Sequence, residues 1–334
     1  MTMRYTAKTV AGAAMCAALV SSGCQAVGGE PGPTTTPASD SGVASAPAPV
    51  PHTEVLQAVQ AAAELRELPA NITNAELLAA SGDYSDQWSI EGCEPSLAET
   101  RLADIGPCTF GDSTSERTMV LIGDSAASMW HGALDLIGKR NNWRVIALTK
   151  SNCGPASLTY YQWQLERAYT ECDDWQDWRM EIIGQEKAEI VVMAGWYDGG
   201  NQGPGRETTP QIWRDALVET IRALPEGSKA VLLGNIARPS QNPSECAANN
   251  PTDLTRCATP AADALPEQAG WSGAAEVTGQ TFVDVDPWFC TEVCPAVIAD
   301  QLVYSGRYHL TEEYARYLSG SIEEIITPAL HAPR

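Results

Sequence analysis

The chain has 334 residues and a formal net charge of −21, from 42 acidic and 21 basic side chains. Because no basic patch or stripe appears in the sequence, this charge argues against binding to DNA or RNA. It fits instead a soluble surface that faces an external medium.

Residues 1–24 are typical of a lipoprotein-type signal peptide. A short basic region precedes an apolar segment at about residues 9–20, which is too short to span a bilayer as a finished helix. The segment leads to Gly23-Cys24, and Cys24 would become the lipidated first residue of the exported chain, although Ser21 departs from the aliphatic residue usual there. We therefore expect a protein anchored by lipid to the outer face of the cell membrane, or otherwise secreted.

The next segments lead from this anchor to the main domain. Residues 25–52 are rich in Gly, Pro, Ser, Thr and Ala, a composition typical of a disordered tether. A helix is expected over residues 53–65. The remainder of an N-terminal extension, up to residue 116, is expected to be irregular, held by disulfides and packed against the domain at 117–334.

Short apolar runs alternate with helical patterns in the main domain. Runs of this kind are typical of parallel strands that are buried on both faces. The alternation predicts a three-layer α/β/α fold with its active residues at the carboxyl ends of the strands. The predicted strands are 118–122, 144–148, 190–194, 230–233 and 281–285, and the predicted helices are 126–140, 174–185, 211–224 and 311–326.

The first predicted strand runs directly into Gly123-Asp124-Ser125, and helix-forming residues follow at once. This places the Ser125 hydroxyl at the carboxyl edge of the sheet and at a helix N-terminus, where free N–H groups and the helix dipole favour a developing oxyanion. A second triplet, Gly111-Asp112-Ser113, lacks a preceding apolar run and is typical of a surface turn. The alternative for Ser125 is a purely structural helix N-cap.

A serine needs a base to become a nucleophile, and the chain has four histidines. His52 lies in a Pro-rich stretch and His331 lies near the C-terminus. His131 would lie on the helix that Ser125 opens, about 600° around and about 9 Å along it, so it cannot reach the hydroxyl. The remaining candidate is His309, at the start of the last predicted helix. The pair Ser125 and His309 predicts a serine esterase or acyl-transfer enzyme.

Eight cysteines remain if Cys16 leaves with the signal peptide and Cys24 carries lipid. An even number in an exported chain favours disulfides, and the close spacings suggest four local bridges in order along the chain. A zinc site is disfavoured, because no second Cys/His pair at zinc spacing accompanies the last two cysteines. We expect no metal and no cofactor. The eight are Cys93, Cys108, Cys153, Cys172, Cys246, Cys257, Cys290 and Cys294.

Several sequence blocks, in order from about residue 60 to the end, carry a family pattern. They are Leu68-Pro69-Ala70-Asn71-Ile72-Thr73, Cys108-Thr109-Phe110-Gly111-Asp112, Ile122-Gly123-Asp124-Ser125, Leu148-Thr149-Lys150-Ser151-Asn152-Cys153, Cys172-Asp173-Asp174-Trp175 and Pro287-Trp288-Phe289-Cys290-Thr291-Glu292-Val293-Cys294-Pro295, then Tyr304 and His309-Leu310-Thr311. With them the chain resembles the SGNH (GDSL-like) hydrolase domain at the C-terminus of acyltransferase-3 membrane proteins, which O-acylate cell-surface glycans. We expect a lipoprotein-type signal here in place of the membrane acyltransferase half.

The resemblance implies a flavodoxin-like α/β/α fold in which Ser125 is the nucleophile and His309 the base. It supports the disulfides Cys153–Cys172 and Cys246–Cys257. It also implies that the oxyanion donors are the N–H groups of Ser125 and Gly154, whereas the family's third donor, an asparagine, is not visible in the block Ala194-Gly195-Trp196-Tyr197-Asp198.

Two side chains near the predicted nucleophile and strand ends are candidates for substrate binding. Trp196 could form a wall of the pocket, and core packing is the alternative for this residue. Asp124 is the other candidate.

Two positions depart from the family pattern. Ala126 stands where the family usually has His. Gly306 stands where the family has an Asp, three residues before the catalytic His, which would hold the imidazole in the correct tautomer. Three alternatives follow: a Ser-His dyad with the ring held by a backbone carbonyl, a carboxylate supplied by Asp284 or Asp286, or reduced or absent activity.

The leading hypothesis is an exported O-acyl esterase or O-acyltransferase that acts on cell-envelope carbohydrate through an acyl-enzyme on Ser125. Its partners would be an acylated glycan and a separate membrane acyltransferase that delivers acyl groups. The competing hypothesis is a catalytically weak or inactive glycan-binding or accessory lipoprotein, which the residue Gly306 favours.

Overall fold

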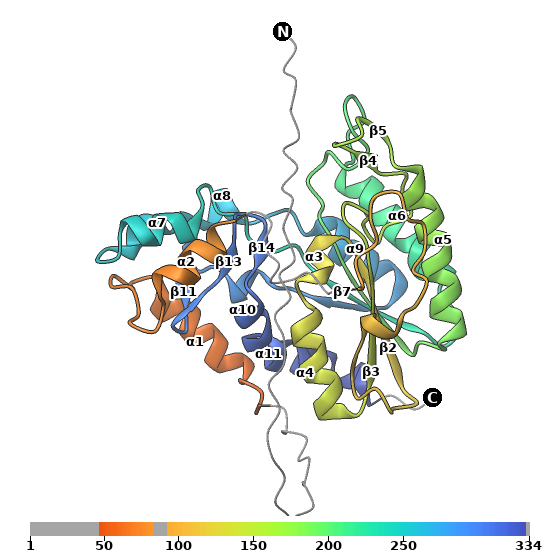
Figure 1. The fold of residues 1–334 in the computed structure, drawn as a ribbon, viewed down its shortest axis with the longest axis horizontal. Coiled ribbons are helices and arrows are strands. Elements are labelled where there is room, and N and C mark those ends of the chain that lie inside the picture. Colours follow the sequence, from red (N-terminus) through yellow and green to blue (C-terminus); the bar gives the residue numbers. More distant parts are fainter. Residues whose placement is uncertain (1–46, 83–91, 332–334) are drawn as a thin grey trace, which may run out of the picture. The chain divides into compact units, whose positions relative to one another are not determined.

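The computed structural model describes residues 47–82 and 92–331 (Figure 1). The predicted signal peptide, Cys24 and nearly all of the predicted tether lie outside the described residues. Across these two ranges, none of the helices has the length and apolar character needed to cross a bilayer.

A six-stranded sheet forms the centre of the fold, in the order β1-β3-β2-β6-β7-β9. The last five are mutually parallel and correspond to the five predicted strands, and their order is the flavodoxin-like one. The edge strand β1 was not predicted, and it pairs antiparallel with β3. The strands are β1 (Thr109–Gly111), β2 (Thr118–Gly123), β3 (Arg144–Thr149), β6 (Ile190–Ala194), β7 (Lys229–Leu233) and β9 (Thr281–Val283).

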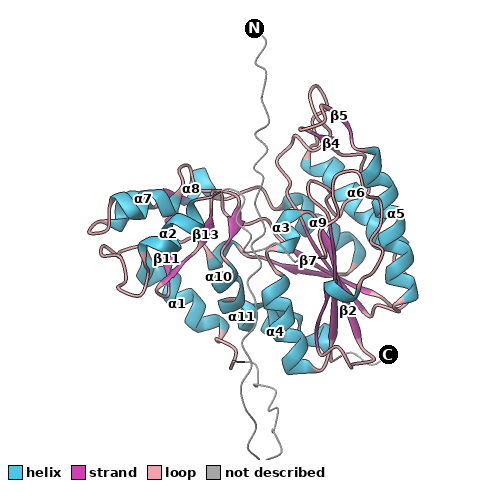
Figure 2. Cartoon of the chain, in the orientation of Figure 1, coloured by secondary structure: helices cyan, strands magenta, loops and turns pink. Residues whose placement is uncertain are grey.

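Helices cover both faces of this sheet (Figure 2). Met119 and Leu121 face the core on the side of α4 and α11, whereas Val120 and Ile122 face the core formed with α5, α6 and α9. Because both faces are buried, every residue of β2 is buried, and the strand shows no alternation of polar and apolar residues. The helices are α4 (His131–Asn141), α5 (Thr170–Gln185), α6 (Pro210–Ala223), α9 (Ala269–Thr278) and α11 (Ser319–Leu330).

Two predicted helices are interrupted. The one after β2 consists of α3 (Ser125–Ser128) and α4, with a break at Trp130, whose N–H donates to the carbonyl of Ala127 in a tighter turn. The indole of Trp130 is fully buried at this break. The last predicted helix consists of α10 (Glu312–Tyr317) and α11, with the break at Leu318.

The extension packs into the same core as the sheet. Helix α1 (His52–Ala62) contributes Val55 and Val59 to it. The segment predicted to be irregular also contains α2 (Asn74–Ser81), which begins with a capping box between Thr73 and Glu76.

Short elements complete the structure. The hairpin of β13 and β14 pairs Ser305 with His309 and carries His309. The remaining elements are the helices α7 (Pro243–Asn249) and α8 (Ala261–Ala264), the 3₁₀ turns Gly106–Cys108, Leu254–Cys257 and Asp286–Trp288, and the strands β4 (Tyr161–Gln162), β5 (Arg167–Ala168), β8 (Thr259–Pro260), β10 (Val293–Cys294), β11 (Val297–Ile298), β12 (Gln301–Leu302), β13 (Tyr304–Ser305) and β14 (His309–Leu310).

Four disulfides join the eight cysteines in order along the chain, as their spacing suggested. One of them connects the turn after β3 to the first turn of α5, and so fixes a loop at the carboxyl end of the sheet. The bridges are Cys93–Cys108, Cys153–Cys172, Cys246–Cys257 and Cys290–Cys294.

Candidate active site

Ser125 lies at the carboxyl end of β2, as the first residue of α3. Strand β2 can pass into this tight turn because Gly123 has a φ of 146°, and a Cβ there would lie 1.8 Å from the carbonyl oxygen of Ala194 on β6. Since β2 lies between β3 and β6, Ser125 occupies the point where the strand order reverses. Ligands bind at this point in open α/β sheets.

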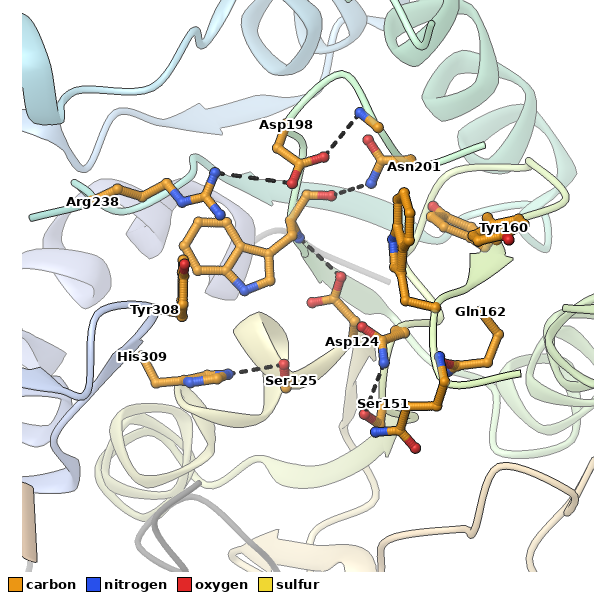
Figure 3. A pocket seen from close by; sticks show the side chains of 16 residues that line it. Asp124, Ser125, Ser151, Tyr160, Gln162, Asp198, Asn201, Arg238, Tyr308 and His309 are labelled. Atoms are coloured by element: carbon orange, nitrogen blue, oxygen red, sulfur yellow. Dashed lines mark hydrogen bonds and ion pairs between the residues drawn. The ribbon is translucent and has the colours of Figure 1, made fainter. Parts of the chain in front are cut away.

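His309 approaches Ser125 from the β13–β14 hairpin. Its Nε2 atom lies 2.9 Å from the Ser125 Oγ, across a sequence separation of 184 residues (Figure 3). The imidazole is largely buried, with 6% of the residue exposed. The structure therefore brings the two predicted residues to the distance that a serine nucleophile and its general base require.

The other three histidines have different surroundings. The Nδ1 atom of His131, at the start of α4, lies 2.8 Å from the carbonyl oxygen of Ser128. The Nδ1 atom of His52 accepts a hydrogen bond from the indole N–H of Trp288, and His331 directly follows the last residue of α11. None of the three lines the pocket that the described residues form around Ser125. The second Gly-Asp-Ser triplet begins with Gly111, the last residue of β1, and continues into a turn in which Asp112 accepts a hydrogen bond from the N–H of Thr114.

Asp124 joins the start of α3 to the loop after β6. One carboxylate oxygen accepts from the N–H of Ala126 in α3 and the other from the N–H of Trp196 after β6, both at 2.9 Å. Burial raises the pKa of Asp124 to about 6, against the opposing effect of these two hydrogen bonds. The side chain borders the pocket, but its carboxylate binds the backbone, so it positions Ser125 and Trp196 relative to each other.

A cavity of about 420 Å³ opens around Ser125 and His309. Its walls come from the turn after β3, the β4–β5 hairpin, the loop after β6, the segment after β7 and the β13–β14 turn. Among its described lining residues, Arg238 is the one arginine or lysine. The lining residues are Asp124, Ser125, Ser151, Asn152, Tyr160, Tyr161, Gln162, Trp163, Gln164, Trp196, Asp198, Gly200, Asn201, Arg238, Tyr308 and His309.

One wall of the cavity combines a cation with two aromatic rings. The Arg238 guanidinium carbon lies 4.7 Å from the ring centroid of Trp196 and 5.0 Å from that of Tyr308, and the two rings meet edge to face. An Arg238 nitrogen lies 3.9 Å from a carboxylate oxygen of Asp198. Trp196 both lines the cavity and packs against the core, so the two expectations for this residue were not exclusive.

Sequence reasoning did not find Arg238, Tyr308 or Asn201. Arg238 follows β7 by five residues, and Asn201 follows β6 by seven. Their position after the carboxyl ends of parallel strands was the available signal. Asn201 supplies an asparagine side chain to this cavity, although it lies beyond the block in which the family's asparagine was sought.

Gly154 lies behind the cavity wall. Its carbonyl accepts a hydrogen bond from the buried Arg179, and a Cβ at Gly154 would lie 2.5 Å from the Tyr160 hydroxyl. The residues of this loop that line the cavity are Ser151 and Asn152. The role of Gly154 as an oxyanion donor stays a prediction.

Neither predicted alternative acid lines the cavity. The carboxylate of Asp286 accepts a hydrogen bond from the side chain of Gln268 at 2.8 Å, and burial raises its pKa to about 6. Asp284 accepts from the N–H of Asp286. The Asp286 carboxylate therefore binds Gln268 and not the His309 imidazole. The role of Asp286 as the acid that orients His309 stays a prediction, and these contacts do not support it.

Gly306 is the first residue of the β13–β14 turn. Its φ of 60° is in the left-handed region that favours glycine, and its N–H donates to the carbonyl of Ala80 at 2.7 Å. The position at which the family has an Asp therefore has a backbone conformation that suits glycine here.

Comparison with known proteins agrees with the fold and with the order of the motifs. The family model described as "SGNH domain (fused to AT3 domains)" matches residues 92–324. The periplasmic domain of the lipopolysaccharide acetyltransferase of Salmonella ser. Paratyphi A superposes with a TM-score of 0.56 at 15% identity, over 79% of this chain and 99% of that one. Est24, a carbohydrate acetylesterase from Sinorhizobium meliloti, superposes with a TM-score of 0.40 at 11% identity, over 63% of this chain and 98% of that one. No curated protein sequence matches the chain.

Proposed function

The chain belongs to the family of SGNH domains that are fused to AT3 domains, and from this premise we propose that it is a serine-dependent O-acyl esterase or O-acyltransferase for cell-envelope carbohydrate. The observation that carries the proposal is the 2.9 Å contact between His309 Nε2 and Ser125 Oγ inside a cavity large enough for an acylated sugar.

In the proposed reaction, His309 Nε2 accepts the proton of the Ser125 hydroxyl while Oγ attacks the acyl carbonyl carbon. The resulting oxyanion is stabilised by the N–H of Ser125 at the start of α3, with Gly154 as the predicted second donor. The bond to the sugar oxygen then breaks, and His309 returns the proton to that oxygen. The acyl group on Ser125 then passes to water or to a second sugar hydroxyl. His309 takes the proton of the attacking hydroxyl and returns it to the Ser125 Oγ as the acyl–Oγ bond breaks.

The lining of the cavity supports carbohydrate as the substrate. Aromatic rings at Trp196 and Tyr308 offer surfaces for the apolar faces of sugar rings, and Ser151 and Asn201 offer groups for hydroxyls. The structural relative from Salmonella is the periplasmic domain of a lipopolysaccharide acetyltransferase. We propose that this protein likewise works outside the cytoplasm, anchored through Cys24, with acyl groups supplied by a separate membrane acyltransferase when it acts in transfer.

A second candidate function is a glycan-binding accessory protein with little or no catalytic activity. The observation that favours it is that glycine stands at position 306, where the family has an acid. A fluorophosphonate probe separates the two candidates, because it labels an activated serine and leaves an unactivated one unmodified.

The experiment that tests the proposal is hydrolysis of p-nitrophenyl acetate by the full-length chain. We expect Ser125→Ala and His309→Ala each to lower kcat by at least about 10³-fold, because the two residues act as a unit. The matched controls are Ser113→Ala, in the second Gly-Asp-Ser triplet, and His131→Ala, and both should retain wild-type turnover. Retained activity in Ser125→Ala would contradict the assignment, and a wild type that neither turns over esters nor labels would favour the accessory function.

A further inference from the structure

The β4–β5 hairpin, residues 161–168, forms one side of the mouth of the cavity. Figure 1 shows it beyond the ends of α5 and α6, at the top of the view. Trp163 of this hairpin lines the cavity, and 57% of the residue is nevertheless exposed. Single exposed apolar residues are ordinary on protein surfaces, but this ring also lines the cavity, so its open face is available to a ligand there.

The exposed indole is held in place from behind. Its ring meets the ring of Tyr161 edge to face, with 4.8 Å between the centroids. Tyr161 is anchored in turn, because its N–H donates to the carbonyl of Asn201 and its ring packs on Gly203, where a Cβ would lie 2.4 Å away. The base of the hairpin is tied to α5 by two hydrogen bonds between Arg167 and Glu171. The Trp163 ring is therefore held in a fixed position before any ligand binds.

Two side-chain amide groups that line the cavity with this indole each have one atom without a hydrogen-bond partner among the residues described. Gln162 is fully buried and its Oε1 accepts from the N–H of Gln164, while its Nε2 has no hydrogen-bond partner among the residues described. The Nδ2 of Asn201 donates to the carbonyl of Trp196, and within the same described ranges its Oδ1 has no partner. Buried polar groups are almost always satisfied, and both of these residues line the cavity, so a ligand bound there can supply the missing partners. A donor and an acceptor together suit hydroxyl groups, which both donate and accept.

We propose that the β4–β5 hairpin carries a second sugar-binding subsite, next to the place where the ester reacts. The Trp163 indole stacks on the apolar face of a neighbouring sugar residue, and Gln162 Nε2 and Asn201 Oδ1 bind its hydroxyls. The substrate is therefore a glycan chain, and a single acylated sugar fills only part of the site. This inference rests on the proposed function, because a subsite beside Ser125 affects turnover only if Ser125 reacts with the ester.

The test compares acetyl esters of increasing length on the full-length chain: p-nitrophenyl acetate, then O-acetylated monomers and tetramers of chito- and manno-oligosaccharides. In at least one series we expect kcat/KM to rise about tenfold from monomer to tetramer, equivalent to about 1.4 kcal/mol of binding. Trp163→Ala should lower kcat/KM for the tetramer about tenfold more than that for p-nitrophenyl acetate, and Trp163→Phe should restore most of the difference. Leu165→Ala is the matched control, since Leu165 is exposed on the same hairpin but does not line the cavity, and it should change neither value.

Two results would overturn the subsite: equal kcat/KM for monomer and tetramer in both series, or an equal loss on all esters in Trp163→Ala. Failure of the proposed function looks different, because then the wild type leaves p-nitrophenyl acetate intact. In that case the subsite is still tested by titrating unacetylated tetramers onto the Ser125→Ala protein with and without Trp163→Ala. Binding about tenfold weaker without the indole supports the subsite, and unchanged or absent binding refutes it.

Discussion

Replacement of Asp124 by Asn tests whether the buried carboxylate holds the nucleophile in place. The wild-type side chain accepts one hydrogen bond on each oxygen, from Ala126 and from Trp196. An amide of the same shape has one oxygen and one NH₂ group, so one of the two backbone N–H groups would face another donor. A buried donor without an acceptor costs about 1–3 kcal/mol.

The substitution also removes a cost that the wild type carries. Burial raises the pKa of Asp124 from 3.8 to about 6, and about two pKa units correspond to about 3 kcal/mol for keeping this carboxylate ionised at pH 7. A neutral amide has no such cost. The two terms are of similar size and opposite sign, so we expect Asp124→Asn to leave the free energy of unfolding within about 1–2 kcal/mol of the wild type.

Activity should respond differently from stability. Loss of either hydrogen bond frees the start of α3 or the loop that carries Trp196, and a misplacement of about 1 Å can lower a rate about 10²-fold. We expect kcat for p-nitrophenyl acetate to fall about 10- to 100-fold in a protein that is still folded. Asp112→Asn, the same change in the exposed Gly-Asp-Ser triplet, is the control and should leave kcat unchanged.

The measurement combines urea unfolding of the full-length chain at pH 7 with steady-state kinetics of both variants. Unchanged kcat in Asp124→Asn would show that the carboxylate does not position Ser125. A loss of more than about 4 kcal/mol of stability would refute the compensation described above, because it would mean that the ionised carboxylate is net favourable in the fold.

Three further predictions concern Asp124, Gly306 and Gly123. The pKa of Asp124 is raised in the folded state, so the folded protein binds more protons than the unfolded chain between about pH 4 and pH 6. Urea titrations should therefore show that the stability of the wild type, relative to Asp124→Asn, falls as the pH rises through this window. The kcat of the wild type should rise over the same window, as the carboxylate ionises. Gly306→Asp should lower stability by about 1 kcal/mol or more through its left-handed φ, without raising kcat, and a tenfold gain in kcat would show that the site lacked only an acid. Gly123→Ala should cost more than about 4 kcal/mol in thermal unfolding because of its overlap with Ala194, whereas Gly279→Ala, with positive φ but open space, should cost about 1 kcal/mol; similar losses would contradict the steric reading of Gly123.

The central strands could be predicted because their signal is local. A parallel strand buried on both faces is a short apolar run, and residues 190–194 were predicted with the observed bounds. The edge strand β1 could not be predicted from its sequence, because Thr109–Gly111 is half-buried and is defined by its pairing with β3. Helix α2 was missed although Thr73 and Glu76 form a readable capping box. The break at Trp130 depends on how its indole packs in the core, which no local pattern shows.

The candidate site was predictable to the extent that its residues lie at strand ends or in motifs. Ser125 follows a strand directly, and His309 remained after the other histidines had been excluded by position. Arg238, Tyr308 and Asn201 belong to loops, and their side chains line one cavity only because six separate segments of the chain converge there. Sequence periodicity carries no information about that convergence.

Gly306 bears on whether the site has lost its catalytic activity or works without an acid at this position. If an acid had been lost by simple drift, its position would be expected to keep a backbone conformation open to any residue. Instead Gly306 has a φ of 60° and its N–H is bonded to Ala80 of the N-terminal extension, so the turn that presents His309 is built around glycine. The same turn carries Tyr308, which packs against Arg238 in the cavity wall, and His309 still reaches Ser125 at hydrogen-bond distance. An intact Ser-His contact on a turn that favours glycine supports a working site without an acid at this position over a triad with one member removed.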